Sequence, residues 1–234
     1  MRQKCRQCKI LFKKKYAKQK FCSIICSNRH NLNNKVVFKR PINYSGELAE
    51  LFGILLGDGS VTKYYLKIYL NIKADIGYAS KIEKIINLAL PKAKVTIYAR
   101  EKRGTEEIQV SSKDVCDYCR LAGFDPKKRY IPKWIAEKDK FIKRTIRGLF
   151  DTEGSIGIKR FQGKNDIYIY RQLTFTNSNK NLLKFVESGL LKFGFSPTKN
   201  SKKNIYLSNK KDIKRYFEII GTNNPKLVKK LKMG

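Results

Sequence analysis

A nine-residue pattern that occurs twice constrains the fold of this chain more than any other feature. Residues 51–59 read Leu-Phe-Gly-Ile-Leu-Leu-Gly-Asp-Gly, and residues 146–154 read Ile-Arg-Gly-Leu-Phe-Asp-Thr-Glu-Gly, at an offset of 95. A second match follows at an offset of 98, with Lys-Asp-Val at 113–115 and Lys-Asp-Ile at 211–213. Two matches at nearly the same offset predict two similar half-domains in one chain.

Both copies of the pattern lie in stretches with helical character, 48–57 and 142–152, that are apolar on most sides. A helix buried between two half-domains has this composition. Gly53 and Gly148 occupy the same place in the two copies. Glycine inside a helix costs roughly 1 kcal/mol relative to alanine, and close contact between the two helices at these positions is a sufficient reason for it.

Each helical stretch ends at an acidic residue followed by glycine, Asp58-Gly59 and Glu153-Gly154. Glycine suits the turn that ends a helix. If the helices pair about a pseudo-twofold axis, Asp58 and Glu153 converge, and such carboxylates repel unless they are protonated, paired or bound to a hard divalent ion. Either acid alone is equally well explained as a hydrogen-bonding residue at a helix end. Recurrence in both copies favours a paired metal site.

Alternating polar and apolar residues follow each copy of the pattern. The alternation has the period of a half-buried strand, and runs of it occupy 65–73, 95–99, 108–110, 167–176 and 205–207. Arg171 breaks one run, which suggests a bulge there. Helical spacing separates the strand pairs, at 82–89 and 182–191. Each half therefore has the order helix, strand pair, helix, strand pair, helix, in an α+β fold.

The polar positions of these strands form the expected free face of two antiparallel sheets, since the apolar side packs on helices. Polar side chains on such a face supply phosphate contacts and base-edge hydrogen bonds, although a solvated face is the alternative for any single strand. The residues expected to contact DNA are Tyr65, Lys67, Tyr69, Asn71, Tyr98, Arg100, Gln109, Ser111, Lys159, Tyr168, Tyr170, Gln172, Thr174, Thr176, Asn177, Tyr206 and Ser208.

The charge of the chain indicates a polyanionic partner. Lys and Arg total 52 against 19 Asp and Glu, a net charge of +33 spread along the sequence. An anionic membrane surface could also attract such a chain, but the sequence contains no long apolar run and no signal-peptide pattern. Nucleic acid is therefore the better partner. A hydrophobic fraction of 41% excludes a disordered basic tail.

Six cysteines without a secretory signal favour a reducing, intracellular compartment. They do not distinguish cytoplasm, nucleoid and organelle.

The first cysteines have the spacing of a zinc site, with Cys5 and Cys8 forming one pair and Cys22 and Cys26 the other. Four thiolates satisfy one tetrahedral Zn²⁺, which supplies much of the folding free energy of so small a module. The expected zinc finger covers residues 1–34 and contacts DNA through its basic residues.

The only histidine, His30, is an alternative ligand to one of the four cysteines. Cys116 and Cys119 have no second pair near them in the sequence and are expected to be core thiols. Residues 35–44 have neither clear periodicity nor helix caps, and we expect them to form a linker.

The finger resembles the small treble-clef or ribbon-like fingers of mobile-element nucleases, through Phe-Cys-Ser-Ile-Ile-Cys at 21–26. Residues 45–234 resemble the LAGLIDADG homing endonucleases in their single-chain, two-repeat form. The resemblance rests on both nine-residue copies and on the Ile-Pro lead-in of Tyr-Ile-Pro-Lys-Trp-Ile at 130–135. It implies two αββαββα half-domains, 45–137 and 138–234. It further implies a saddle of two sheets in the DNA major groove and a double-strand cut with short 3′ overhangs by a monomer.

The resemblance also assigns roles to individual positions. Asp58 and Glu153 correspond to the family's Mg²⁺ ligands, at a site with two or three divalent ions, and the residues before them, Gly57 and Thr152, correspond to donors of backbone carbonyls. Lys73 matches a basic residue that tunes the water network. The second half offers Asn177 or Ser178 instead of a lysine, so the two strand cuts are expected to differ in rate.

The expected function is therefore site-specific cleavage of double-stranded DNA. No histidine is available as a base in residues 45–234, so metal-bound or bulk water would attack each phosphate, with Lys73 adding charge. The main alternative is an RNA-binding intron maturase on the same fold, and another is a DNA-binding regulator that does not cut. An intein is not expected, since the chain lacks a splicing-type Cys or Ser start and a terminal His-Asn.

Overall fold

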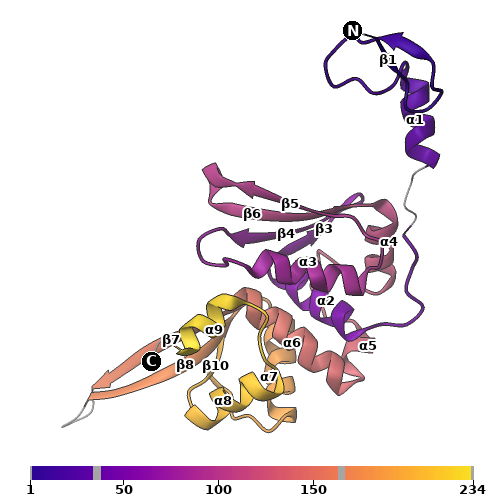
Figure 1. Cartoon of the computed structure of the whole chain (residues 1–234). Helices are drawn as coiled ribbons and strands as arrows, with labels where there is room; N and C mark the ends of the chain where they lie inside the picture. The colour runs from indigo at the N-terminus through magenta and orange to yellow at the C-terminus, as the bar shows by residue number, and fades with distance from the viewer. Residues whose placement is uncertain (1, 34–37, 163–166, 233–234) are drawn as a thin grey trace. The chain divides into compact units, whose positions relative to one another are not determined.

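The computed structural model describes residues 2–33, 38–162 and 167–232, and the chain forms two compact units, Met1–Val37 and Phe38–Gly234 (Figure 1). The first unit consists of an antiparallel strand pair and a helix, which are β1 (Arg2–Lys4), β2 (Leu11–Lys13) and α1 (Ile24–Asn33). The boundary expected at residues 34 and 35, and the start of the expected linker, lie outside the described residues.

The larger unit contains two halves with the same order of elements. The first half comprises α2 (Gly46–Asp58), β3 (Gly59–Val61), β4 (Tyr65–Asn71), α3 (Tyr78–Ala89), β5 (Val95–Arg100), the short 3₁₀ helix η1 (Glu101–Arg103), β6 (Thr105–Ser111) and α4 (Lys113–Leu121). The second comprises α6 (Asp139–Glu153), β7 (Gly154–Gln162), β8 (Ile167–Thr176), α7 (Lys180–Lys192), β9 (Thr198–Ser201), β10 (Asn204–Leu207) and α8 (Lys210–Ile219). The αββαββα order predicted for each half is confirmed.

Each half folds into one antiparallel sheet of four strands. The strand orders are β3-β4-β6-β5 and β7-β8-β10-β9, so the two sheets have equivalent topologies. Helices α2 and α6 lie side by side at the centre of the unit (Figure 1). Every residue of α2 from Leu48 to Gly57 is buried, as the continuous apolar sequence of this helix requires.

Two helices of the larger unit were not expected from the sequence. The first is a single turn, α5 (Lys133–Ala136), and the second is α9 (Pro225–Lys232), which follows α8. Proline at the first helical position and the pair Leu227 and Leu231, four residues apart, are typical of such a short amphipathic helix. Leu227 is buried, so α9 is part of the packed unit.

The bulge predicted at Arg171 is wrong. Strands β7 and β8 pair without interruption from Gly154 opposite Phe175 to Gln162 opposite Ile167. Arg171 therefore keeps its place on the apolar side of β8, and its guanidinium donates a hydrogen bond to the carbonyl oxygen of Leu231 at 2.9 Å. This hydrogen bond to α9 gives the charged side chain a partner at the edge of the core, so β8 needs no bulge at Arg171.

Part of the expected linker packs on the larger unit. Phe38 is buried, and its ring meets that of Tyr118 edge-on with 5.7 Å between centroids. Tyr44 stacks on Trp134 at 4.2 Å. Phe38 and Tyr44 therefore attach this segment to the larger unit. No helix in the described ranges is both long and apolar enough to cross a membrane.

Candidate active site

The central helices α2 and α6 approach each other so closely that only glycine fits at the crossing. A methyl group built on Gly53 would lie 2.3 Å from the carbonyl oxygen of Thr145, and one on Gly148 would lie 2.3 Å from the carbonyl oxygen of Glu50. The hydroxyl of Thr145 donates a hydrogen bond of 3.0 Å to the carbonyl oxygen of Ala49. Backbone contact between the helices explains both glycines and fixes the relative position of the two helix ends.

The two helix ends bring the acidic residues of the repeated pattern together. A methyl group on Gly57 would lie 2.1 Å from the Thr152 hydroxyl oxygen and 3.3 Å from Cγ of Glu153. Helix α2 ends at Asp58 and helix α6 at Glu153, and each is followed by the glycine that begins the next strand. We call Asp58 and Glu153 the motif acids.

The surroundings of the motif acids disfavour negative charge. Burial raises the pKa of Asp58, and the nearby Asp75 raises it further. Burial also raises the pKa of Glu153, with a contribution from Asp58. The positive charge of Arg129 opposes both shifts. Two partly buried carboxylates that repel each other form a site that a cation would stabilise.

Of the residues that follow β4 and β8, Asn177 bonds to a motif acid, whereas Lys73 and Ser178 are exposed. The side-chain amide of Asn177 donates a hydrogen bond of 3.1 Å to Oε1 of Glu153, so this buried residue supports a motif acid and does not lie on the open sheet face where we expected it. Lys73 has an exposed side chain, and its backbone N–H donates to Oδ1 of Asn71 at 3.0 Å. Ser178 is also exposed.

The polar faces of the two sheets carry the tyrosines predicted to contact DNA. Exposed fractions of 40% to 57% are found for Tyr65, Tyr69, Tyr98, Tyr168 and Tyr170. The other exposed or half-exposed positions of the predicted set are Lys67, Asn71, Arg100, Gln109, Ser111, Lys159, Thr174, Thr176 and Ser208.

Besides Asn177, two positions of the predicted set are buried, against the expectation of an open face. Gln172 is 8% exposed and its side-chain nitrogen lies 3.3 Å from the hydroxyl of Ser208, while Tyr206 is 9% exposed. Gln172 and Tyr206 lie on the inner strands β8 and β10, which have a paired strand on either side. The open part of the second sheet face is therefore formed mainly by β7 and the beginning of β8.

Comparisons with known proteins agree on the fold. A family model described as a LAGLIDADG-like domain matches residues 140–221. The chain has the LAGLIDADG fold. Two proteins of Methanocaldococcus jannaschii are each 26% identical to it: the uncharacterized protein MJ0314, over 78% of this chain, and the replication factor C small subunit, over 81%. The chain spans 64% and 10% of the lengths of these two relatives.

Solved structures with the LAGLIDADG fold superpose on most of the chain. I-DmoI in complex with DNA and Mn matches with a TM-score of 0.53 and 21% identity, over 76% of this chain and 98% of that chain. The meganuclease I-AabMI bound to uncleaved DNA matches with 0.54 and 12%, over 79% and 87%. The N-terminal LAGLIDADG domain of DUF199/WhiA matches with 0.51 and 15%, over 77% and 86%.

A C-terminal segment holds the two LAGLIDADG helices of this chain from one side. The backbone N–H of Asn223 donates to the Asp151 carboxylate at 2.8 Å, and its side-chain amide donates to Glu50. The side-chain amide of Asn224 donates to the carbonyl oxygen of Asp151 at 2.8 Å. Residues 223 and 224 therefore form hydrogen bonds to both α2 and α6. No periodic pattern in the sequence predicts this role.

The same segment places a cation near the motif acids. The ammonium of Lys226 lies 2.8 Å from Oδ1 of Asp75, which also accepts a hydrogen bond of 3.0 Å from Asn224. Lys226 is close enough to Asp58 to oppose the rise of the pKa of that acid. Sequence analysis missed Asp75 and Lys226, because neither belongs to a periodic pattern and the two residues lie far apart in the sequence.

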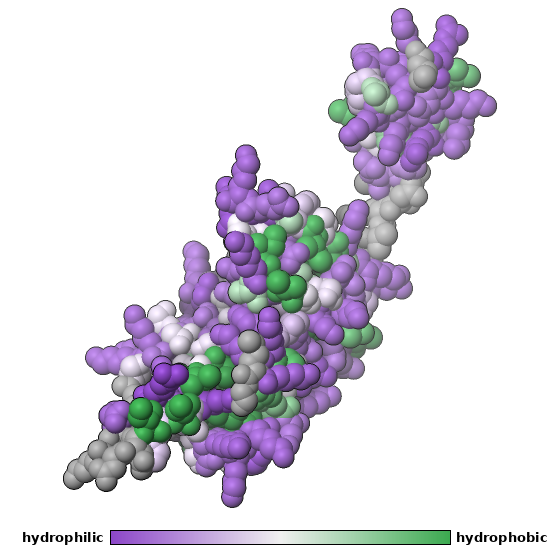
Figure 2. All heavy atoms as spheres, turned by 60° about the vertical axis from the view of Figure 1, so that its left-hand side comes forward, coloured by the Kyte–Doolittle hydropathy of each residue, from purple (hydrophilic) through white to green (hydrophobic). Residues whose placement is uncertain are grey.

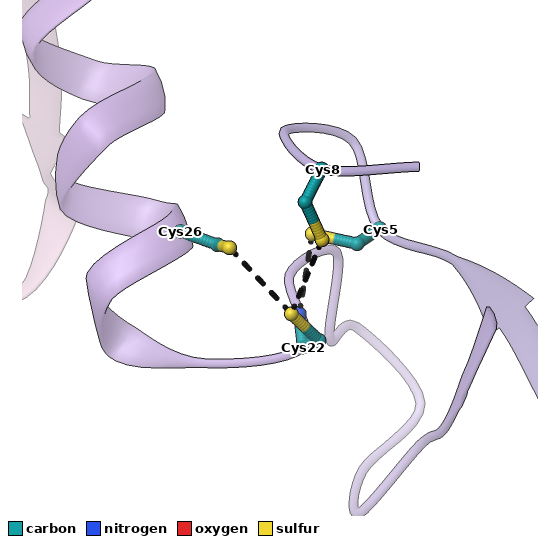
Figure 3. Close-up of side chains that lie close together, drawn as sticks. All are labelled: Cys5, Cys8, Cys22 and Cys26. Carbon is teal, nitrogen blue, oxygen red and sulfur yellow. Dashed lines mark hydrogen bonds between the residues drawn. The ribbon is translucent and has the colours of Figure 1, made fainter. Parts of the chain in front are cut away.

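The four cysteines of the N-terminal unit form a cluster (Figure 3). Their sulfur atoms all lie within 4.8 Å of one another, and those of Cys8 and Cys26 each lie 3.6 Å from that of Cys22. Thiolates that share a tetrahedral zinc ion are about 3.8 Å apart, given Zn–S bonds near 2.3 Å, so the cluster fits zinc. The ring of His30 packs against Phe21 with 5.0 Å between centroids.

The remaining cysteines and the surface of the first unit agree with the sequence analysis. Cys116 and Cys119 are fully buried in the larger unit, which confirms them as core thiols. In Figure 2, hydrophilic side chains cover most of the face that the first unit presents. A small module with so little buried apolar surface depends on a staple such as a metal ion for its stability.

Proposed function

We propose that this chain is a site-specific DNA endonuclease that hydrolyses both strands of a duplex with Mg²⁺ ions held by Asp58 and Glu153. The observation that carries the proposal is the convergence of these motif acids at the ends of two helices in backbone contact. A regulatory protein that only binds DNA has no need for two partly buried, mutually repelling carboxylates at this point.

The residues of the site fit divalent ions with oxygen ligands. Asp58 and Glu153 supply carboxylate oxygens, and we assign the carbonyl groups of Gly57 and Thr152 as further ligands. When bound, such ions stabilise the pentavalent oxyanion and the leaving 3′ oxygen. The hydrogen bond from Asn177 orients the Glu153 carboxylate toward the site.

We assign Lys73 to the first half-site as a charged residue that orders the attacking water. Asn177 already bonds to Glu153 and carries no charge, so the second half-site has no equivalent lysine. The two strands of the substrate are therefore cut at different rates. The positive charges of Arg129 and Lys226 limit the repulsion between the carboxylates before the ions bind.

The two sheets supply the surface that binds double-stranded DNA. Exposed tyrosines and basic side chains on their polar faces offer phosphate contacts and base-edge hydrogen bonds. A net charge of +33 makes binding strongly salt-dependent. The LAGLIDADG structures solved with DNA, I-DmoI and I-AabMI, support this partner. One chain contains both half-sites, so a monomer suffices for cleavage, and the zinc-stapled finger adds affinity.

Sequencing of cleaved ends tests the proposed function. The protein is incubated with a randomised duplex library and Mg²⁺, and the ends formed are sequenced. We expect staggered ends at one defined sequence, absent without Mg²⁺ and absent with a protein carrying both Asp58→Asn and Glu153→Gln. Specific binding without any cut would make the chain a regulator, and selective binding of structured RNA alone would make it a maturase; either result overturns the nuclease proposal.

A further inference from the structure

One carboxylate lies in the middle of the basic face of the first sheet. Glu107 on β6 is paired with Tyr69 on β4 and Tyr98 on β5, so it shares their polar face. Its side chain is only 7% exposed, whereas both tyrosines are 40% exposed or more. A carboxylate at this place repels phosphate, and the four strands of the second sheet contain no acidic residue.

Glu107 bonds to two of the cations predicted to contact DNA. Its Oε1 lies 2.6 Å from the ammonium of Lys67, and its Oε2 lies 3.2 Å from the guanidinium of Arg100. The bond to Lys67 holds the pKa of Glu107 below its usual range, and Glu107 raises the pKa of Lys67. Glu107 and Lys67 are therefore both charged at neutral pH. One carboxylate fixes cations from the two strands that flank β6.

Aromatic rings also contact the side chains of Lys67 and Arg100. The ammonium of Lys67 lies 5.5 Å from the centre of the Tyr65 ring, and the guanidinium of Arg100 lies 5.5 Å from the centre of the Tyr98 ring. Contacts of this length are favourable cation–π interactions. Each long side chain is thus held between Glu107 and a tyrosine, and its donors point from a defined position on the sheet.

Stability alone does not account for this cluster. Replacing a mostly buried ion pair by apolar residues is often neutral or stabilising, and Lys67 and Arg100 keep exposed fractions of 25% and 50%. Free lysine and arginine side chains bind phosphate at any sequence, while side chains held in place can read guanine O6 and N7 in the major groove. We therefore expect the cluster to fix the positions of Lys67 and Arg100 more than to stabilise the fold.

We propose that Glu107 determines DNA sequence specificity by holding Lys67 and Arg100 in position to read guanine and by withholding them from sequence-independent phosphate contacts. This inference rests on the proposed function, because it assumes that the first sheet faces DNA. Glu107 itself acts as a positioning residue. The base contacts belong to Lys67 and Arg100.

The test compares Glu107→Gln with Glu106→Gln in the full-length protein. Glu106 is the adjacent residue of β6, but it is paired with Leu70 and Ala99 on the opposite face. Both variants remove one negative charge from the chain, and only the first releases Lys67 and Arg100. Affinity for a random-sequence duplex is measured against salt concentration, and preferred sequences are selected from a randomised duplex library.

For Glu107→Gln we expect tighter binding to the random duplex at low salt, with a salt slope steeper by about 1 to 2, so that raising the salt from about 50 to 200 mM weakens binding about threefold more for each additional phosphate that the released cations neutralise. Enrichment of one or two guanine positions in the selected sequences should disappear. Glu106→Gln should keep both the enrichment and, within a fraction of a unit, the slope.

Three outcomes overturn the inference. Equal behaviour of the two variants would mean that Glu107 holds no DNA-contacting cation. Loss of selectivity at a cytosine, with an unchanged salt slope, would mean that Glu107 contacts the base itself. If the unmodified protein binds no duplex at all, the proposed function fails together with this inference, whereas the first two outcomes leave the proposed function intact.

Discussion

A single methyl group at the helix crossing tests the packing that brings the motif acids together. In a Gly53→Ala variant the new methyl carbon would lie 2.3 Å from the carbonyl oxygen of Thr145 and 3.0 Å from the backbone nitrogen of Leu149. Ordinary contact begins near 3.4 Å, so α2 and α6 must separate by about 1 Å. Both neighbours are backbone atoms of a buried helix, and no side chain can turn away.

The cost of this separation exceeds the gain in helix propensity. Overpacking of a core costs about 1–3 kcal/mol, and rigid backbone neighbours place Gly53→Ala near the upper end. Alanine returns about 1 kcal/mol through its higher helix propensity. We therefore expect the free energy of unfolding to fall by about 2 kcal/mol, and Tm by about 4–8 °C for a unit of this size.

Urea unfolding followed by tryptophan fluorescence measures the effect. The only tryptophan, Trp134, packs against Phe52 of α2 and Phe141 of α6, so its emission reports this unit. Gly157→Ala is the matched control, because a methyl group there meets no atom within 4 Å. The control should be neutral or up to about 1 kcal/mol more stable. Equal stability of the two variants would refute backbone contact between the helices.

Three further predictions concern single side chains. Lys226→Met should lower the free energy of unfolding by about 1–3 kcal/mol, because it leaves the mostly buried Asp75 without its cation; a double-mutant cycle with Asp75→Asn that finds no coupling would contradict this pairing. Cys22→Ser should abolish the one zinc ion per chain found by metal analysis, while Cys116→Ala retains it; equal zinc contents would place the metal elsewhere. Lys73→Ala should slow one strand cut more than the other, as strand-specific labelling reports, and equal slowing would remove Lys73 from its half-site.

The order of elements was readable from the sequence because periodicity depends on neighbouring residues, and because the repeat indicates the same order of elements in both halves. Alternation identifies β4 and β8, and the repeated glycines identify the helix crossing, since only a close approach of two backbones needs them. The cysteine spacing identifies the cluster for a similar reason. A few residues at fixed spacing determine which side chains can reach one ion.

Contacts between distant segments were not readable. Asp75 and Asn224 are separated by 149 positions, and Asn223 and Glu50 by 173, yet each pair is joined by a hydrogen bond. The hydrogen-bond partner of a polar loop residue cannot be predicted from sequence periodicity. Glu107 was missed for another reason: alternation places it on the polar face, but the excess of positive charge directs attention to lysines and arginines.

Strand-resolved cleavage of the selected DNA site tests most directly whether the motif acids form one composite centre. Each strand is labelled separately, and single-turnover cleavage is followed for the unmodified protein, Asp58→Asn and Glu153→Gln. Since Asp58 and Glu153 meet at the same pair of helix ends, either substitution should abolish the cutting of both strands while DNA binding persists. Loss of one strand cut in each variant, with the other cut at its normal rate, would contradict a shared centre and indicate two independent sites.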